Sequence, residues 1–370
     1  DYFQCLIESI KCHHNDIAKY IEDNLLDQSE IESRKEEIVF NCLKYHNYSF
    51  MQVETIIDNS VCLCLVHYDK LIDLALKMAN ESNKICELCY CYRMLANKTE
   101  IDQNNSTFES FTHMFIPSSI TCIPCLYFRN FKSLKRITFD VDSSITKIGD
   151  NAFYMCESLT QINIPSYVTE FGENAFFGCS SLTKITIPSY VTSIGNGVFS
   201  GCSSLTQITI PTSVTEIGIK AFARCSSLVQ ITIPTSVTKI GESAFSECSS
   251  LEHIMIPTSV TKIGKSAFSK CSSLTDMLIP FSVTEIGIKA FEKCSSLVQI
   301  SIPSSVMSIE ESAFSECSSL VQITIPFSVT KIGTKAFEKC SSLAQITIPT
   351  SVSKIGDSAF SECSSLTDML

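Results

Sequence analysis

Residues Leu228 to Ser250 read LVQITIPTSVTKIGESAFSECSS, and this 23-residue unit recurs through the second part of the chain. We number its positions from leucine at position 1 to serine at position 23. Leucine returns at position 1 every 23 residues, at Leu159, Leu182, Leu205, Leu228, Leu251, Leu274, Leu297, Leu320, Leu343 and Leu366. A fixed period of this length predicts a solenoid, in which each repeat forms one rung of a stack.

Less regular sequence before Leu159 keeps the same register. Leu134 begins a rung in which Asp140 replaces the proline and two residues are added before Ile145. Phe111 begins another, with aromatic residues in place of Leu and Cys. Atypical terminal repeats are normal in solenoids. We therefore expect eleven complete rungs, starting at 111, 134 and 159 and then every 23 residues, followed by a partial rung at 366.

The spacing of apolar residues predicts the structure of one rung. Apolar side chains at positions 1, 4 and 6 alternate with polar ones, which indicates a short strand with one buried face. Proline at position 7 ends this strand, because proline cannot donate to a sheet ladder. Positions 10 and 13 form a second short segment, and Ala-Phe-x-x-Cys closes the rung as a helical turn or an irregular arc. Glycine at position 14 suits a turn with positive φ, although Glu310 replaces it in one rung.

The order Leu-x-x-Ile-x-Ile-Pro-x-x-Val-x-x-Ile-Gly-x-x-Ala-Phe-x-x-Cys resembles the BspA-like family, also described as the Treponema-type leucine-rich repeat, found in bacterial and protozoan surface antigens. The resemblance covers about residues 111 to 370. It implies a right-handed solenoid with a parallel sheet on one face and, for some members, adhesion to host matrix proteins. It implies less about function than about fold, because a fold does not define a site.

Residues 1 to 110 contain neither glycine nor proline and differ from the repeats. Their apolar residues keep helical spacing, as in Phe3, Leu6, Ile7 and Ile10. The segment from Leu6 to Asp27 resembles the helix pair of an ankyrin repeat, without the Thr-Pro-Leu-His turn of that family. We expect an all-α, ankyrin-like domain here, which makes the fold class of the whole chain α+β.

Charge and motifs narrow the classes of function. The formal net charge is −11, and no stripe of Lys or Arg follows the rungs, so nucleic acid is not an expected partner. No apolar run reaches the length of a membrane span. The G-x-S-x-G, P-loop and H-E-x-x-H motifs are missing, and His253 is the single histidine of the regular repeats. We predict that the protein is not an enzyme and binds no cofactor.

Ten of the twenty cysteines fall at position 21 of the repeat. Neighbouring rungs lie about 4.8 Å apart, whereas a disulfide requires Cβ atoms within roughly 3.5 to 4.5 Å. These cysteines are therefore expected to be free thiols that act as small buried hydrophobic side chains. They are Cys156, Cys179, Cys202, Cys225, Cys248, Cys271, Cys294, Cys317, Cys340 and Cys363.

Two other groups of cysteines suggest specific chemistry. A zinc site could use the ligand types Cys62, Cys64, His67, Cys86, Cys89 and Cys91, but their spacing matches no standard site. Cys122 and Cys125 form a C-x-x-C of the redox type. Ile123 between them is a predicted core position, and no strand-to-helix start follows, which argues against redox chemistry. We predict no metal ligand in the chain.

A binding face would be built from positions 2, 3 and 5 of the first strand, which point outward. Most rungs carry Gln and Thr at positions 3 and 5. The two adjacent rungs that start at Leu251 and Leu274 carry other residues there. Exposed apolar residues among charges are typical of a protein-binding site, although neutral drift in a recently duplicated array also produces such a break. The predicted partner-binding residues are Glu252, His253, Met255, Asp276, Leu278 and Phe281. Phe327, Tyr167 and Tyr190 are further aromatic residues expected at the rim.

We interpret the chain as a non-catalytic protein-binding or adhesion module. The resemblance favours a surface antigen that binds host or matrix protein through the repeat sheet. Free thiols and an ankyrin-like region favour an intracellular scaffold instead, and catalysis in the helical region is a third reading. Because the sequence stops within the strand that begins at Leu366, we expect a longer natural chain and end-to-end self-association through the last rung.

Overall fold

The computed structural model describes residues 112–369, apart from 117, 119 and 120. The chain divides into two compact units, residues 1–103 and 104–370, and the described residues all belong to the second. The predicted helical domain at 1–110, its ankyrin-like segment and the six candidate zinc ligands lie outside the described residues.

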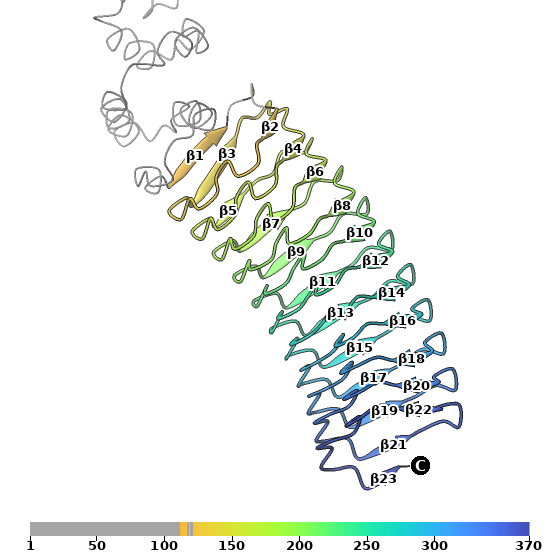
Figure 1. Cartoon of the computed structure of the whole chain (residues 1–370). Helices are drawn as coiled ribbons and strands as arrows, with labels where there is room; N and C mark the ends of the chain where they lie inside the picture. The colour runs from red at the N-terminus through yellow and green to blue at the C-terminus, as the bar shows by residue number, and fades with distance from the viewer. Residues whose placement is uncertain (1–111, 117, 119–120, 370) are drawn as a thin grey trace, which may run out of the picture. The chain divides into compact units, whose positions relative to one another are not determined.

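The repeats form a β-solenoid in which each complete rung contributes two short strands (Figure 1). The first strands, at positions 3 to 5, pair in parallel with the same positions of the neighbouring rung. They make two sheets, one of β1 (His113–Ile116), β3 (Arg136–Phe139), β5 (Gln161–Ile162), β7 (Lys184–Thr186), β9 (Gln207–Thr209), β11 (Gln230–Thr232) and β13 (His253–Met255), the other of β15 (Asp276–Leu278), β17 (Gln299–Ser301), β19 (Gln322–Thr324), β21 (Gln345–Thr347) and β23 (Asp368–Met369).

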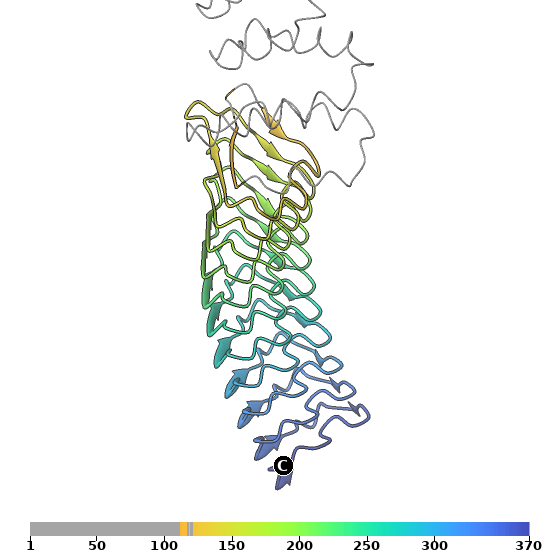
Figure 2. The same cartoon turned by 90° about the vertical axis from the view of Figure 1, so that its left-hand side faces the viewer.

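The second strands, at positions 12 and 13, form three further parallel sheets along the same stack (Figure 2). The first contains β2 (Cys122–Ile123), β4 (Lys147–Ile148) and β6 (Glu170–Phe171). The second contains β8 (Ser193–Ile194), β10 (Glu216–Ile217), β12 (Lys239–Ile240), β14 (Lys262–Ile263) and β16 (Glu285–Ile286). The third contains β18 (Ser308–Ile309), β20 (Lys331–Ile332) and β22 (Lys354–Ile355).

The core contains the predicted repeat positions. In the rung that begins at Leu228, the side chains at positions 1, 4, 6, 10, 13, 17, 18 and 21 are all buried. The phenylalanines of position 18 stack face to face through the array, as Phe245 does on Phe268 with ring centroids 5.5 Å apart. Even the irregular first rung buries Met114, Ile116 and Phe128. The predicted register is therefore confirmed from the described part of the first rung onward.

The corners of a rung are made by hydrogen bonds. Val237 N donates to Pro234 O at 3.0 Å, which closes the turn between the two strands. In the rung with two extra residues, Ser143 N donates to Asp140 O at 3.1 Å, so the insertion is absorbed within this turn. Positions 15 to 23 form an irregular arc of turns, and the described residues contain no helix. The repeat unit is thus a β-solenoid, and the α part of the predicted α+β class concerns residues that are not described.

The predicted role of the glycine at position 14 is wrong. Positive φ occurs at positions 16 and 20 of every rung, as at Ser243 (φ 55°) and Glu247 (φ 64°), and not at position 14. Gly241 is required for another reason, because a Cβ atom there would lie 2.6 Å from the backbone carbon of Gly218 in the preceding rung. Glycine at position 14 therefore permits close stacking of backbones.

Where this close stacking fails, the ladder of second strands is interrupted. Gly333 N donates to Ile309 O at 2.7 Å, and Gly287 N donates to Ile263 O at 3.0 Å. Glu310 occupies the equivalent position between them, makes no such bond, and lies where β16 and β18 belong to separate sheets. The Cβ of Glu310 explains this break, since it occupies the space that glycine leaves free.

Candidate functional site

The six predicted partner-binding residues are all exposed: Glu252 directly before β13, His253 and Met255 on β13, Asp276 and Leu278 on β15, and Phe281 in the turn that follows β15. Met255 and Leu278 are each 75% exposed and Phe281 is 76% exposed. Their strands bury the intervening side chains Ile254 and Met277, so the alternation of the strand directs its neighbours outward. These large apolar side chains are therefore available for contact.

The backbone ladder of the first strands is interrupted at this place. β13 ends one sheet and β15 begins the next, although the two strands occupy consecutive rungs. Thr275 N reaches Glu252 O at 3.5 Å, and His253 Nδ1 lies 3.4 Å from Asp276 Oδ1 across the same gap. The two rungs that differ in sequence are thus also the two between which the sheet is divided.

Further apolar side chains extend this surface toward the C-terminal rungs. Phe327 occupies position 8 two rungs after Phe281 and is 78% exposed. Met307, at position 11 of the rung between them, is also exposed. Met307 was not among the predicted residues, and the replacement of the usual Thr by Met at an outward position was the available signal. We call Met255, Leu278, Phe281 and Phe327 the apolar patch.

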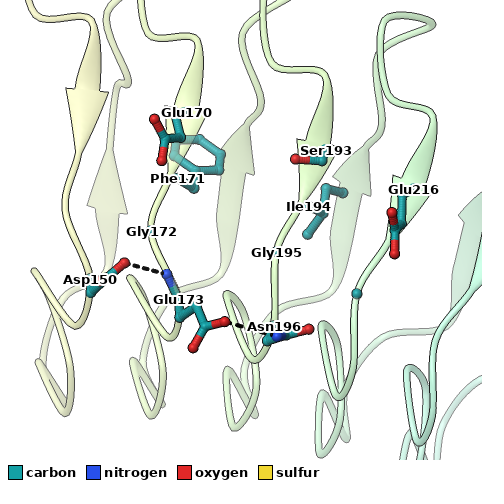
Figure 3. A pocket seen from close by; sticks show the side chains of 11 residues that line it. Asp150, Glu170, Phe171, Gly172, Glu173, Ser193, Ile194, Gly195, Asn196 and Glu216 are labelled. Atoms are coloured by element: carbon teal, nitrogen blue, oxygen red, sulfur yellow. Dashed lines mark hydrogen bonds between the residues drawn. The ribbon is translucent and has the colours of Figure 1, made fainter.

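A separate hollow of about 270 Å³ opens between β6 and β8, where the ladder of second strands is also divided (Figure 3). Phe171 and Val198 are buried here in place of the usual Ile and Ala. A Cβ atom on Gly195 would lie 3.6 Å from Phe171 O, about an ångström farther than at the other rungs. The larger core side chains therefore explain why these two rungs stand apart.

The acidic side chains that line this hollow are engaged in structural interactions. Asp150 Oδ1 accepts a hydrogen bond from Glu173 N at 2.9 Å, and Asn196 Nδ2 donates to Glu173 Oε1 at 2.9 Å (Figure 3). Glu170 pairs with Lys147 at 3.0 Å, and Glu216 pairs with Lys239 at 2.7 Å. These contacts connect neighbouring rungs.

A second groove runs along the arc between Arg224 and Lys293 and is lined by the serines of position 22. Glu247 lies between two of its cations, 3.2 Å from Arg224 and 3.1 Å from Lys270. The hydrogen bond from Lys270 and the charge of Arg224 hold the pKa of Glu247 below its ordinary value. The lining therefore contains three cations and one carboxylate, and its third cation, Lys293, lies 3.4 Å from Glu316 of the next rung.

The described part of the chain bears on three further candidates, namely the C-x-x-C of Cys122 and Cys125, metal ligands and membrane-spanning helices. Cys122 and Cys125 are exposed while Ile123 between them is buried, as the repeat register predicts. No group of three or more His, Cys, Asp or Glu side chains within the described residues could hold a metal ion. The same residues include no helix with the length and apolarity that crossing a bilayer requires.

Comparison with known families gives a match over the whole repeat region. The model of the BspA type leucine rich repeat region matches residues 99–218, 192–298 and 284–370, with six copies. A leucine rich cell surface protein from Faecalibacterium prausnitzii has a similar structure, with 37% sequence identity, 70% of this chain and 78% of that chain covered, and a TM-score of 0.51. No curated protein matches the chain.

Two further solved structures match at lower identity and lower TM-score. A leucine-rich repeat protein from Bacteroides ovatus is 29% identical, covers 61% of this chain and 82% of its own, and gives a TM-score of 0.38. The pneumococcal vaccine antigen PcpA is 23% identical, covers 70% of this chain and 67% of its own, and gives a TM-score of 0.49. No catalytic family is indicated.

Proposed function

Because the chain belongs to the BspA-type leucine-rich repeat family, we propose that it is a non-catalytic module that binds host or matrix protein through the sheet of its first strands. The name of the Faecalibacterium protein, a leucine rich cell surface protein, supports a location at the cell surface. Repeat solenoids in general present long surfaces suited to protein partners.

The exposed apolar patch is the observation that carries this proposal. Its side chains are more than 70% exposed, Met255 and Leu278 on strands whose outward positions are elsewhere mainly Gln and Thr, and Phe281 and Phe327 in the turns that follow such strands. Exposed apolar side chains beside charged ones are typical of interaction sites, and a few such residues usually contribute most of the energy of binding. Glu252, His253 and Asp276 supply the polar surroundings.

Binding of the full chain to immobilised matrix proteins and to host-cell surfaces tests the proposal. A triple variant, His253→Ala with Met255→Ser and Leu278→Ser, should retain the fold because all three side chains are exposed. It should lose binding, whereas matched changes at Gln207 and Thr209, which are also exposed on a first strand but lie outside the rungs of the patch, should not.

Each result separates one reading from the others. Equal binding by the triple variant and by the control would remove the patch as the site. If the unmodified chain binds neither matrix proteins nor host cells, the adhesion function is wrong, and an intracellular scaffold becomes the better reading.

A further inference from the structure

We propose that the partner element seated on the apolar patch is an amphipathic α-helix with basic flanking residues, lying across the rungs along the direction of stacking. This inference deepens the proposed function and rests on it. It follows from the spacing of the rungs, the positions of the four apolar side chains, and the charges around them.

The distance between rungs matches the pitch of an α-helix. In the core, consecutive phenylalanine rings are 5.5 Å apart from Phe268 to Phe291 and 5.4 Å apart from Phe291 to Phe314. Backbones of paired strands lie about 4.7–4.9 Å apart, and an α-helix rises about 5.4 Å per turn. A helix that crosses the rungs therefore places one turn over each rung throughout a patch that spans four rungs.

The apolar side chains are spaced by one rung or by two rungs, and side chains on one face of a helix can match both distances. Met255 and Leu278 are one rung apart, and helix residues at i and i+3 or i+4 advance by about 4.5 to 6 Å. Phe281 and Phe327 are two rungs apart, and residues at i and i+7 advance by about 10.5 Å. Met255 and Leu278 share position 5 and Phe281 and Phe327 share position 8, so the apolar face of the proposed helix covers both positions of the rungs.

Other peptide conformations fit less well. An extended strand directs side chains to one face only every second residue, about 6.6 Å apart, which suits neither spacing. A polyproline II segment repeats its face every three residues, about 9.3 Å. This repeat matches the two-rung distance between Phe281 and Phe327. It is too long for Met255 and Leu278, which are one rung apart, so only one of them could be contacted by the same face of the peptide.

The charges around the patch define the polar part of the helix. In the four rungs that start at Leu251, Leu274, Leu297 and Leu320, outward positions 2, 3 and 5 carry the carboxylates of Glu252 and Asp276 and no Lys or Arg. Both carboxylates are exposed. Lys or Arg beside the apolar stripe of the helix would complement them, and this sets its orientation and specificity more than its affinity.

Selection from displayed peptides tests the inference without knowledge of the natural partner. Three libraries of equal length would be selected on the full chain: helices with a heptad apolar stripe, proline-rich peptides, and peptides of alternating apolar and polar residues. We expect enrichment of the helical library, with apolar residues at i, i+3 or i+4, and i+7 and with Lys or Arg beside them. Circular dichroism should show that enriched peptides are helical when bound.

Variants then locate the site. Leu278→Ser with Phe281→Ser and Phe327→Ser should weaken peptide binding by about tenfold or more, as expected when central apolar contacts are removed. Gln207→Ala with Thr209→Ala, exposed on β9 two rungs before the patch begins, should leave binding unchanged. Glu252→Lys should weaken binding of a peptide with a flanking Lys, and exchange of that Lys for Glu should restore it.

Several outcomes would overturn the inference. Enrichment of proline-rich or alternating peptides at this patch would assign it to another conformation. Helical peptides that bind the serine variant as well as the unmodified chain, or recovery of no helical binder, would contradict it directly. Because the selection uses peptides only, its failure is distinguishable from failure of the chain to bind matrix proteins.

Discussion

Cys248 Sγ donates a hydrogen bond to the carbonyl oxygen of Phe222 in the preceding rung, 3.1 Å away. The equivalent bond is made by every cysteine of position 21, from Cys156 to Cys363. Phe222 O also accepts a backbone hydrogen bond from Cys225 N at 3.2 Å, so the thiol adds a second hydrogen bond, from the next rung, to a carbonyl group of the arc. Sequence alone predicts the burial of these thiols but not this bond, because the arc that positions the carbonyl is irregular.

Buried thiols should make the solenoid sensitive to alkaline pH. Burial raises the pKa of Cys202 and of Cys248 to about 12, whereas thiols of the unfolded chain ionise near about 8.5. Between these values the unfolded state binds fewer protons than the native state, so the free energy of unfolding decreases as pH rises. The contribution of the buried, protonated thiols to the free energy of unfolding is therefore fully present below about pH 8.5. It is lost progressively as the pH rises toward about 12.

Urea unfolding at several pH values measures this effect. The double variant Cys202→Ala with Cys248→Ala keeps the Lys and Tyr side chains that also titrate, so it is the matched reference. We expect its stability to decrease less steeply, by about 1.4 kcal/mol per pH unit for each thiol removed. Equal slopes for the variant and the unmodified chain would contradict the burial of these thiols.

Two glycines at position 14 should differ in their tolerance of alanine. In Gly241→Ala the new Cβ would meet the backbone of Gly218, 2.6 Å away, and such overpacking costs about 1–3 kcal/mol. In Gly195→Ala the nearest atom would be Phe171 O at 3.6 Å, an ordinary contact. Thermal unfolding should show a large decrease for the first variant and little change or a small gain for the second. A similar decrease for both would refute close stacking as the reason for these glycines.

The left-handed positions should favour glycine. Ser243 has φ 55°, and a non-glycine residue in this region is strained by about 1 kcal/mol. Ser243→Gly should therefore stabilise the solenoid by up to about 1 kcal/mol. Ser246→Gly, three residues later in the same rung and without positive φ, should instead destabilise it by about 0.5 to 1 kcal/mol. Chemical denaturation distinguishes the two, and a loss of stability in both would contradict the assignment.

Some features of the solenoid follow from sequence and others do not. Apolar periodicity predicts the strands, the core positions and the outward direction of Met255 and Leu278, because each depends on a repeated pattern. Positive φ at positions 16 and 20 was missed because Lys, Glu and Ser occupy them in most rungs. The signal lies in the less regular rungs, where these positions hold Asn130, Asn151, Asn174, Gly178, Gly197 and Gly201.

The divisions of the sheets were also beyond prediction from the repeat pattern. Two of them coincide with departures that the sequence displays, Glu310 at position 14 and Phe171 at position 13. Both departures change the volume between two rungs. Whether the sheet of second strands is divided there depends on atomic distances rather than on residue type. The division between β13 and β15 coincides with the rungs of His253 and Asp276, and the described contacts do not explain it.

Removal of Glu310 should repair one of these divisions. Glu310→Gly would allow the backbone of this rung to approach that of Gly287, as at the other rungs, and the amide at position 14 could then donate to Ile286 O. One regained hydrogen bond contributes about 1 kcal/mol. The variant also loses the hydrogen bond from Ser308 Oγ to Glu310 Oε1 at 2.6 Å, which offsets part of this gain, and the contact with Lys331, which at 3.8 Å contributes little. Hydrogen exchange should show new protection of this amide, and unchanged exchange would contradict the steric explanation.

Two phenylalanines of very different burial should respond differently to truncation. Phe245 is fully buried and stacks on Phe222 at 5.4 Å and on Phe268 at 5.5 Å, whereas Phe327 is 78% exposed. Phe245→Ala should cost about 3–5 kcal/mol through lost burial and the cavity left in the ladder, and Phe327→Ala should change stability by less than about 0.5 kcal/mol.

Because each rung contacts only its neighbours, the defect at Phe245 should also divide the array into segments that unfold separately. Urea unfolding should therefore broaden for Phe245→Ala, with hydrogen exchange accelerated first in the rungs beside residue 245. A sharp, unchanged transition for that variant would mean that the rungs do not stack through this phenylalanine ladder.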